Sequence, residues 1–203
     1  MDFDWKKLRE QRPWLFMLIV LGKKLRTKVG LVLVAACVAD GFIWWEPPYD
    51  LARPNVWVAL GIVLIAAGIA FRIAALGYLK KKEILATVGV YSLCRHPLYL
   101  GSILMTFGFC LLLDDWINYV VAAVYFAIFY TLTIVWEEIR LTERYGEEHR
   151  RYVEQTPVIL PLGQLRTDGF RLGRALRNGG ALLIGLVVFL LAADGVMGRM
   201  MNR

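Results

Sequence analysis

The sequence predicts an all-α protein, a multi-pass transmembrane helical bundle of about five spans. Of its 203 residues, 58% are hydrophobic and 20% are charged, and the mean hydropathy is +0.52. A soluble domain has roughly 45–50% apolar and about 25% charged residues. The apolar residues also gather in long stretches with the charged residues between them. Such a composition excludes a disordered chain, and an odd number of cysteines, three, argues against a disulfide-stapled secreted domain.

The N-terminal segment, residues 1–28, is expected to be an interfacial amphipathic helix. Its apolar stretch, Trp14 to Leu21, has only eight residues, too few to cross about 30 Å of hydrocarbon. Basic residues flank the stretch on both sides, which favours a helix lying in the headgroup layer. We interpret the basic cluster at 23–28 as attraction to anionic lipid headgroups rather than to nucleic acid.

Five apolar stretches follow and are predicted as spans, because a helix that crosses a bilayer needs roughly 20 apolar residues. They cover residues 29–45, 55–79, 98–113, 116–136 and 181–197. Only Asp114 and Asp115 separate the third from the fourth, so these two are expected to form a tight antiparallel hairpin. We divide the chain into the interfacial segment 1–28, a membrane core 29–161, and a last part, 162–203, made of a cytoplasmic linker and an extra C-terminal transmembrane helix.

The distribution of lysine and arginine predicts the orientation, because cytoplasmic loops carry an excess of them. Residues 1–28 carry eight, the loop 80–97 carries four, and the segment 137–180 carries eight. The loops on the other side carry three, namely Arg53, Arg199 and Arg203. The N-terminus and the two polar segments are therefore expected in the cytoplasm of a bacterial inner membrane or an ER-like membrane.

The first polar segment, residues 87–101, contains a candidate anion site. Gly89 permits a turn with positive φ, and Pro97 suits the first position of a helix. Arg95 and His96 would then lie at a helix N-terminus, where free backbone N–H groups and the helix dipole favour a carboxylate. The alternative for an isolated Arg-His-Pro sequence is an anchor to lipid headgroups.

The second polar segment, residues 136–161, contains adjacent carboxylates. On a helix Glu137 and Glu138 point about 100° apart, so they are not expected to act as an acid/base pair. Glu138 shares a face with Leu141 and Tyr145. Glu137 lies at the membrane mouth, directly below an apolar span, where a lone carboxylate is costly. Gly146 is expected to end this helix.

Together the two segments resemble the isoprenylcysteine carboxyl methyltransferase family, which is related to the phospholipid N-methyltransferases and to bacterial thiol S-methyltransferases. The resemblance covers about residues 80–161. It rests on the following residues, in this order: Tyr91, Arg95, His96, Pro97, Tyr99, Gly101, Glu137, Glu138, Leu141, Tyr145, Gly146, Tyr152, Pro157 and Pro161.

The resemblance implies S-adenosyl-L-methionine (SAM) as methyl donor, S-adenosyl-L-homocysteine as product, and a lipophilic acceptor such as a membrane lipid or prenyl compound. The residues that would bind the cofactor are Glu83, Ile84, Leu85, Ala86, Tyr91, Arg95, His96, Pro97, Leu98, Tyr99 and Glu137. The methionine carboxylate suits the helix start at His96, and the ammonium group suits Glu137. Aromatic rings of Tyr91 and Tyr99 can pack on adenine or face the sulfonium cation.

One position departs from the family pattern. Four residues before Glu137, family members that act on prenylcysteine have a substrate-facing arginine, whereas this chain has Thr133. Arg72, inside the second predicted span, is a candidate for the missing charge, because an ionisable residue within a span is a functional candidate by default. Its alternative is an arginine that snorkels to the interface. We therefore expect Arg72 and Thr133 on the substrate side, and no metal.

Other functions remain open at this stage. A phospholipid N-methyltransferase or a small thiol S-methyltransferase would differ only in the acceptor atom. An NADPH-dependent sterol-type reductase shares distant features of this region but is built from more spans. A non-enzymatic membrane scaffold would not bind SAM and would leave the paired motifs without a role. The extra C-terminal span either shapes a lipid-side entrance or mediates contacts in an oligomer.

Overall fold

The computed structural model describes residues 5–43, 56–79, 84–113, 116–167, 169–177 and 179. Within these ranges every regular element is a helix, and one isolated antiparallel bridge joins Gly89 to Arg166. The all-α class is therefore confirmed for this part of the chain. Glu83 and the predicted span 181–197 lie outside the described residues.

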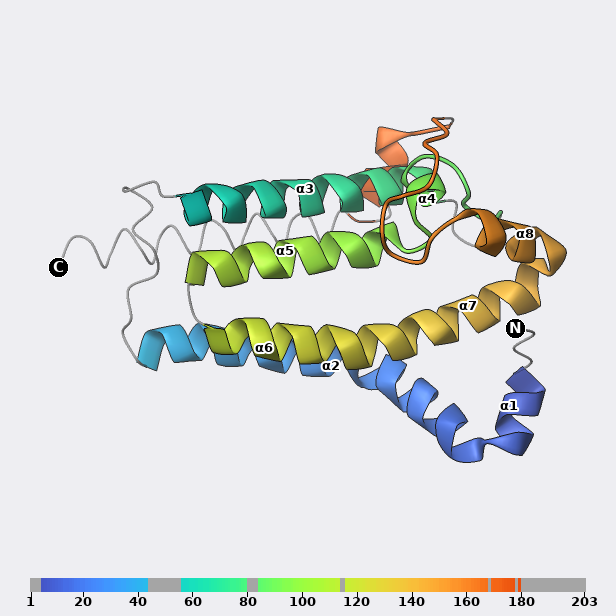
Figure 1. The fold of residues 1–203 in the computed structure, drawn as a ribbon, viewed down its shortest axis with the longest axis horizontal. Coiled ribbons are helices and arrows are strands. Elements are labelled where there is room, and N and C mark those ends of the chain that lie inside the picture. The colour runs from blue at the N-terminus through green and yellow to red at the C-terminus, as the bar shows by residue number, and fades with distance from the viewer. Residues whose placement is uncertain are drawn as a thin grey trace.

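The helices form two groups that meet at one end of the bundle (Figure 1). In one group α3 packs against α5, and in the other α2 lies along the continuous helical run made of α6, η1 and α7. The short helices α4 and α8 lie at the same end. The bounds are Trp5–Gln11 for α1, Pro13–Ile43 for α2, Val56–Tyr78 for α3, Val90–Leu93 for α4, Pro97–Leu113 for α5, Trp116–Tyr125 for α6, Phe126–Tyr130 for η1, Thr131–Tyr145 for α7 and Glu147–Gln155 for α8.

Among the described residues, two helical stretches are long and apolar enough to cross a membrane: Val56–Tyr78 and Trp116–Tyr145. They correspond to the predicted spans 55–79 and 116–136, although the second continues as helix into the polar segment. The predicted span 98–113 is α5, which is apolar but shorter. The number of five spans and their orientation stay predictions.

The N-terminal region differs from the expectation. The predicted interfacial segment and the first predicted span were separated at residue 28, but α2, a single helix of 31 residues from Pro13 to Ile43, continues across that boundary. The basic stretch between them consists of lysine, leucine and arginine with one threonine, and most of these residues have high helix propensity, so nothing in it breaks the helix. Pro13, at the first position of α2, instead separates this helix from α1.

Glycines set the close packing of α3 against α5. A Cβ atom on Gly68 would lie 2.6 Å from the carbonyl oxygen of Gly101, and one on Gly101 would lie 2.7 Å from that of Gly68. Seven residues further along α5, a Cβ on Gly108 would lie 2.7 Å from the carbonyl oxygen of Gly61. Small residues allow such backbone contact between helices in a membrane. This pairing fixes where α5 begins and therefore where the Arg-His-Pro motif lies.

The run α6–η1–α7 contains one turn of π-helix, Phe126–Tyr130. Phe126 is buried against Cys110 of α5 and Ala122 of α6. The rings of Phe126 and Tyr130 meet edge to face, with centroids 4.5 Å apart. Since π turns inside helices are frequent at functional sites, this turn marks the part of the helix next to the polar cluster.

The packing predicts that Gly68→Ala destabilises the protein by about 1–3 kcal/mol, because the added methyl group meets backbone atoms of α5 that cannot move aside. The measurement is the thermal unfolding midpoint of the purified protein in detergent. Gly173→Ala is the matched control, since a Cβ at Gly173 has no atom within 4 Å. Equal effects of the two substitutions would contradict the proposed packing.

Candidate functional site

The turn before α4 is shaped by Gly89, as the sequence predicted. Its φ of 65° lies in the left-handed region that favours glycine, and any Cβ there would collide with the ring of Tyr78. The Gly89 carbonyl accepts a hydrogen bond of 2.7 Å from the hydroxyl of Ser92. Gly89 also pairs with Arg166 through a backbone hydrogen bond. The turn therefore ties α4 to the segment that follows α8.

The backbone at the start of α5 is already hydrogen-bonded. Arg95 N–H donates to the carbonyl oxygen of Pro157 at 2.9 Å, and His96 N–H donates to that of Val158 at 3.1 Å. The expectation that these N–H groups are free for an anion is wrong, because the chain after α8 folds back over them. The helix does begin at Pro97, as predicted.

The anion at this helix start is the protein's own Glu138. Its Oε2 accepts a hydrogen bond from Nη1 of Arg95, and its Oε1 lies 2.8 Å from Nε2 of His96. The side chains of Arg95, His96 and Glu138 are 10%, 3% and 21% exposed. The cluster is therefore an ion pair and a hydrogen bond largely removed from water, and it connects α7 to the start of α5.

Glu137 points to the other side of the same histidine. Its Oε2 accepts a hydrogen bond of 2.7 Å from the hydroxyl of Tyr99 and lies 3.7 Å from Nδ1 of His96. The rings of His96 and Tyr99 are stacked, with centroids 5.4 Å apart. The Glu137 side chain is 40% exposed, about twice as much as that of Glu138. The structure thus brings together His96, Tyr99 and Glu137, three of the residues predicted for cofactor binding.

The role of Glu138 was missed by the sequence analysis, although a signal for it exists. Glu138 shares a helical face with Leu141 and Tyr145, and an apolar face tends to bury a carboxylate. A buried carboxylate needs a cation, and Arg95 is the basic residue of the first motif. A carboxylate on an apolar face and a single arginine in the first motif together predict the ion pair of Glu138 with Arg95.

Several of the remaining predicted cofactor residues differ in their burial. Tyr91 is buried, and its carbonyl oxygen accepts a hydrogen bond of 2.6 Å from the hydroxyl of Tyr152. Leu85 is buried and Ile84 is exposed, so the described part of the predicted turn 83–86 presents Ile84 outward. Pro97 is buried at the start of α5.

The two residues predicted on the substrate side are both engaged within the protein. Thr133 is buried and donates its hydroxyl to the carbonyl oxygen of Phe129, 2.6 Å away on its own helical run. Arg72 extends from α3 to α5, where Nη1 donates to the Ser102 hydroxyl at 2.5 Å and to the Leu98 carbonyl at 3.2 Å. Arg72 therefore faces the neighbouring helix rather than extending along its own helix to the interface.

A buried histidine supports the cluster from α8. His149 is 1% exposed, its Nε2 lies 3.9 Å from Oε2 of Glu138, and its Nδ1 lies 2.9 Å from the hydroxyl of Thr142. Burial lowers the pKa of His149 below its ordinary value, despite the nearby Glu138. Burial also raises the pKa of the Cys94 thiol to about 11, so this residue next to the motif is not a thiolate near neutral pH.

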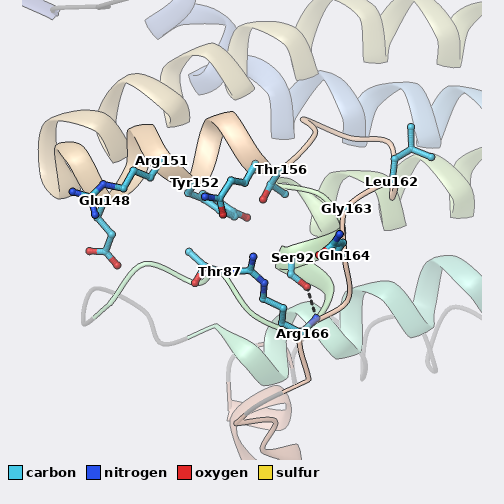
Figure 2. Close-up of a pocket in the computed structure, with 11 residues that line it drawn as sticks. Thr87, Ser92, Glu148, Arg151, Tyr152, Thr156, Leu162, Gly163, Gln164 and Arg166 are labelled. Atoms are coloured by element: carbon cyan, nitrogen blue, oxygen red, sulfur yellow. Dashed lines mark hydrogen bonds between the residues drawn. The ribbon is translucent and has the colours of Figure 1, made fainter.

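A polar cavity of about 740 Å³ lies beside α8 (Figure 2). Its lining includes Ser92 of α4, Arg151 and Tyr152 of α8, and Arg166 from the returning segment. The N–H of Arg166 donates to the hydroxyl of Ser92 at 2.9 Å. The volume of the cavity is in the range of small-molecule sites.

Comparison with known proteins identifies the region that carries this site. Residues 56–148 match the sequence profile of the phospholipid methyltransferase family. The predicted family resemblance is confirmed. The matched region extends from α3 into the start of α8 and includes Arg95, His96, Glu137 and Glu138.

Several curated proteins are similar to part of this chain. The chain is 26% identical to a protein-S-isoprenylcysteine O-methyltransferase of Schizosaccharomyces pombe, over 49% of this chain and 42% of that protein. It is 32% identical to the rat protein of the same name, over 49% of this chain and 35% of the relative. It is also 29% identical to the cobalt-zinc-cadmium resistance protein CzcN of Cupriavidus metallidurans, over 66% of this chain and 61% of the relative. Each match spans less than two thirds of the relative, and no solved structure gives a significant match.

The Glu138 cluster predicts that Glu138→Gln lowers the free energy of unfolding by about 1–3 kcal/mol, since the amide leaves the enclosed Arg95 without its counter-charge. Thermal unfolding in detergent measures the effect. Glu147→Gln is the control, because its pair with Arg150 is exposed and contributes about 0–1 kcal/mol. If Glu138→Gln behaves like this control, the cluster does not hold α7 to α5.

His149 predicts a pH effect of defined sign. Because its folded-state pKa is lowered, folding favours the neutral ring. The stabilisation is present above its unfolded pKa of about 6.5 and is lost as the pH falls below that value, by up to about 1.4 kcal/mol per pH unit. The unfolding free energy of wild type minus that of His149→Gln should therefore decrease from pH 7.5 to pH 5.5. A difference that is constant over this range would contradict the assignment.

Proposed function

We propose that the protein is a SAM-dependent methyltransferase embedded in a membrane, similar to isoprenylcysteine carboxyl methyltransferases, and that its acceptor is lipophilic. The observation that carries the proposal is the meeting of His96 and Tyr99 with Glu137, which come from two segments far apart in the sequence. Both segments lie in the family-matched region. An anionic and aromatic cluster beside apolar helices suits a cationic cofactor and a lipid-borne acceptor.

The residues present fit the cationic end of SAM. Glu137 offers a half-exposed carboxylate, and the aromatic ring of Tyr99 lies beside it. A carboxylate and an aromatic ring both attract ammonium and sulfonium groups. The backbone N–H groups of Arg95 and His96 already donate to the carbonyl oxygens of Pro157 and Val158, so they are not available for the carboxylate of SAM. Nε of Arg95 is the donor left for that group, since it is buried without a hydrogen-bond partner in the described part of the chain.

In this proposal each residue has a defined task. Glu137 binds the cationic end of the cofactor, and the Tyr99 hydroxyl fixes the orientation of that carboxylate through its hydrogen bond. Glu138 is a positioning residue, because it holds Arg95 and His96 in place from behind. When bound, SAM supplies an electrophilic methyl group. The chain's contribution is to align the acceptor with it and to exclude water.

The acceptor atom determines whether a base is needed. A carboxylate or thiolate acceptor is already a nucleophile, whereas an amine must first lose a proton. The two carboxylates of the site are committed to Tyr99, His96 and Arg95. This arrangement favours an acceptor that arrives as an anion. We expect it to enter from the bilayer, and SAM from the cytoplasm, consistent with the basic residues of the segments 80–97 and 137–180.

The test is transfer of a labelled methyl group from SAM to an extract of the host membrane by the full-length protein. Glu137→Gln and His96→Ala should each lower SAM affinity and transfer by at least about tenfold, the effect of losing one charge-assisted contact. Glu143→Gln is the control, because it removes an exposed carboxylate from the same helix. Calorimetric titration with SAM separates binding from transfer.

The product distinguishes the remaining functions. A base-labile ester indicates a carboxyl acceptor, a methylated amine a phospholipid N-methyltransferase, and a thioether a thiol S-methyltransferase. Absence of SAM binding by the folded wild-type protein would support the non-enzymatic scaffold and contradict the proposal. Unchanged binding and transfer by both site variants would contradict the residue assignment alone.

A further inference from the structure

One face of α2 is built to approach the run α6–η1–α7 closely. Gly22, Arg26 and Gly30 are spaced four residues apart and therefore share that face. A Cβ atom on Gly22 would lie 2.5 Å from a side-chain carbon of Leu132, and one on Gly30 would lie 2.6 Å from the hydroxyl of Tyr125. The two glycines thus bring α2 into contact above and below Arg26, and direct its side chain into the bundle.

The guanidinium group of Arg26 reaches the aromatic part of the candidate site. Its central carbon lies 5.2 Å from the ring centroid of Tyr99 and 5.6 Å from that of Tyr130. Its Nη1 is buried and has no hydrogen-bond partner among the described residues. A buried donor without an acceptor is an unfavourable arrangement that an anion would relieve.

The two residues that the sequence predicted on the substrate side already have hydrogen-bond partners within the protein. Thr133 is neutral and bonded to its own helical run, and Arg72 is bonded to Ser102 and the Leu98 carbonyl. Two buried arginine donors have no partner among the described residues, Nε of Arg95 and Nη1 of Arg26. The first is assigned above to the cofactor carboxylate. The second lies beside Tyr99, whose hydroxyl is bonded to Glu137, and remains for the acceptor. Glu137 and Arg26 both contact Tyr99, so opposite charges lie next to one aromatic ring.

We propose that Arg26 binds the anionic group of the acceptor, so that the acceptor is an anionic lipophile carrying a carboxylate or a phosphate. This inference rests on the proposed function and assigns its substrate class to a residue of the N-terminal helix. Tyr99 and Tyr130 provide the aromatic surface beside the bound anion, and Arg26 supplies the charge that Thr133 lacks. Cofactor and acceptor then bind next to each other, with Tyr99 between their sites.

The experiment measures binding without SAM, so that it does not depend on methyl transfer. The full-length protein is placed in phosphatidylcholine nanodiscs and titrated calorimetrically with N-acetyl-S-farnesylcysteine, with the methyl ester of this compound, and with dodecyl phosphate. The acid and its ester differ in charge at one group and share the prenyl chain. The variants are Arg26→Gln and Arg26→Lys, and the control is Lys24→Gln, which removes an exposed charge from the same helix.

We expect the wild type and Lys24→Gln to bind the acid at least about tenfold more tightly than the ester, as one charge-assisted hydrogen bond allows. Arg26→Gln should lose this preference while its affinity for the ester stays unchanged, and Arg26→Lys should keep part of the preference. Binding of dodecyl phosphate that depends on Arg26 would extend the anion class to phosphate, and its absence would restrict the class to carboxylates.

Several results would overturn the inference. One is equal binding of the acid and the ester by the wild type. Another is a preference for the acid that Arg26→Gln retains. If Arg26→Gln binds neither compound, Arg26→Lys decides: a retained preference supports the inference, and loss of both compounds shows that Arg26 serves packing. Failure of methyl transfer with an intact, Arg26-dependent preference would refute the proposed function and leave the anion site in place.

Discussion

The candidate site depends on the enclosed pairing of Glu138 with Arg95 and His96. This carboxylate comes from the long helical run, and its partners come from the turn before α5, so the pairing joins the two groups of helices where they meet. Breaking such a pair leaves an uncompensated charge in a poorly hydrated place. With Arg95 and His96 held by Glu138 on one side, His96 presents its other ring nitrogen to Glu137, which faces outward. One carboxylate organises the cluster, and the side chain of its neighbour is 40% exposed.

Two further constraints keep this pairing in register. The glycines of α3 and α5 bring the helix backbones into contact, so that the position of Pro97 follows from that of α3. The segment after α8 bonds to the backbone of Arg95 and His96 and fixes the turn from the opposite side. The side chains of the motif are therefore held by two different parts of the chain. Such preorganisation is what transfer of a small group between two bound molecules requires.

Local rules predicted the elements well. Pro97 begins a helix, Gly146 ends one, and Gly89 takes a positive φ, because each depends on the residue's own backbone preferences. The meeting of His96 with Glu137 followed from a family resemblance. Other contacts between segments that are far apart in the sequence could not be predicted from local rules. The chain after α8 covers the N–H groups of Arg95 and His96, Glu138 supplies the anion, and Arg26 arrives from α2. No periodicity in the sequence specifies which helices become neighbours.

The single π turn at Phe126–Tyr130 has a consequence for the length of this helix. A π turn accommodates one residue more than an α turn, and each residue rotates the helix that follows by about 100°. The same angle separates Glu137 from Glu138. If the same number of residues formed a regular α-helix instead, α7 would be rotated by about 100° relative to the rest of the bundle. The outward carboxylate would then take the place of the inward one. The chain length between Trp116 and Glu137 is thus matched to the π turn, and one residue fewer there would keep the same phase only with a regular α-helix.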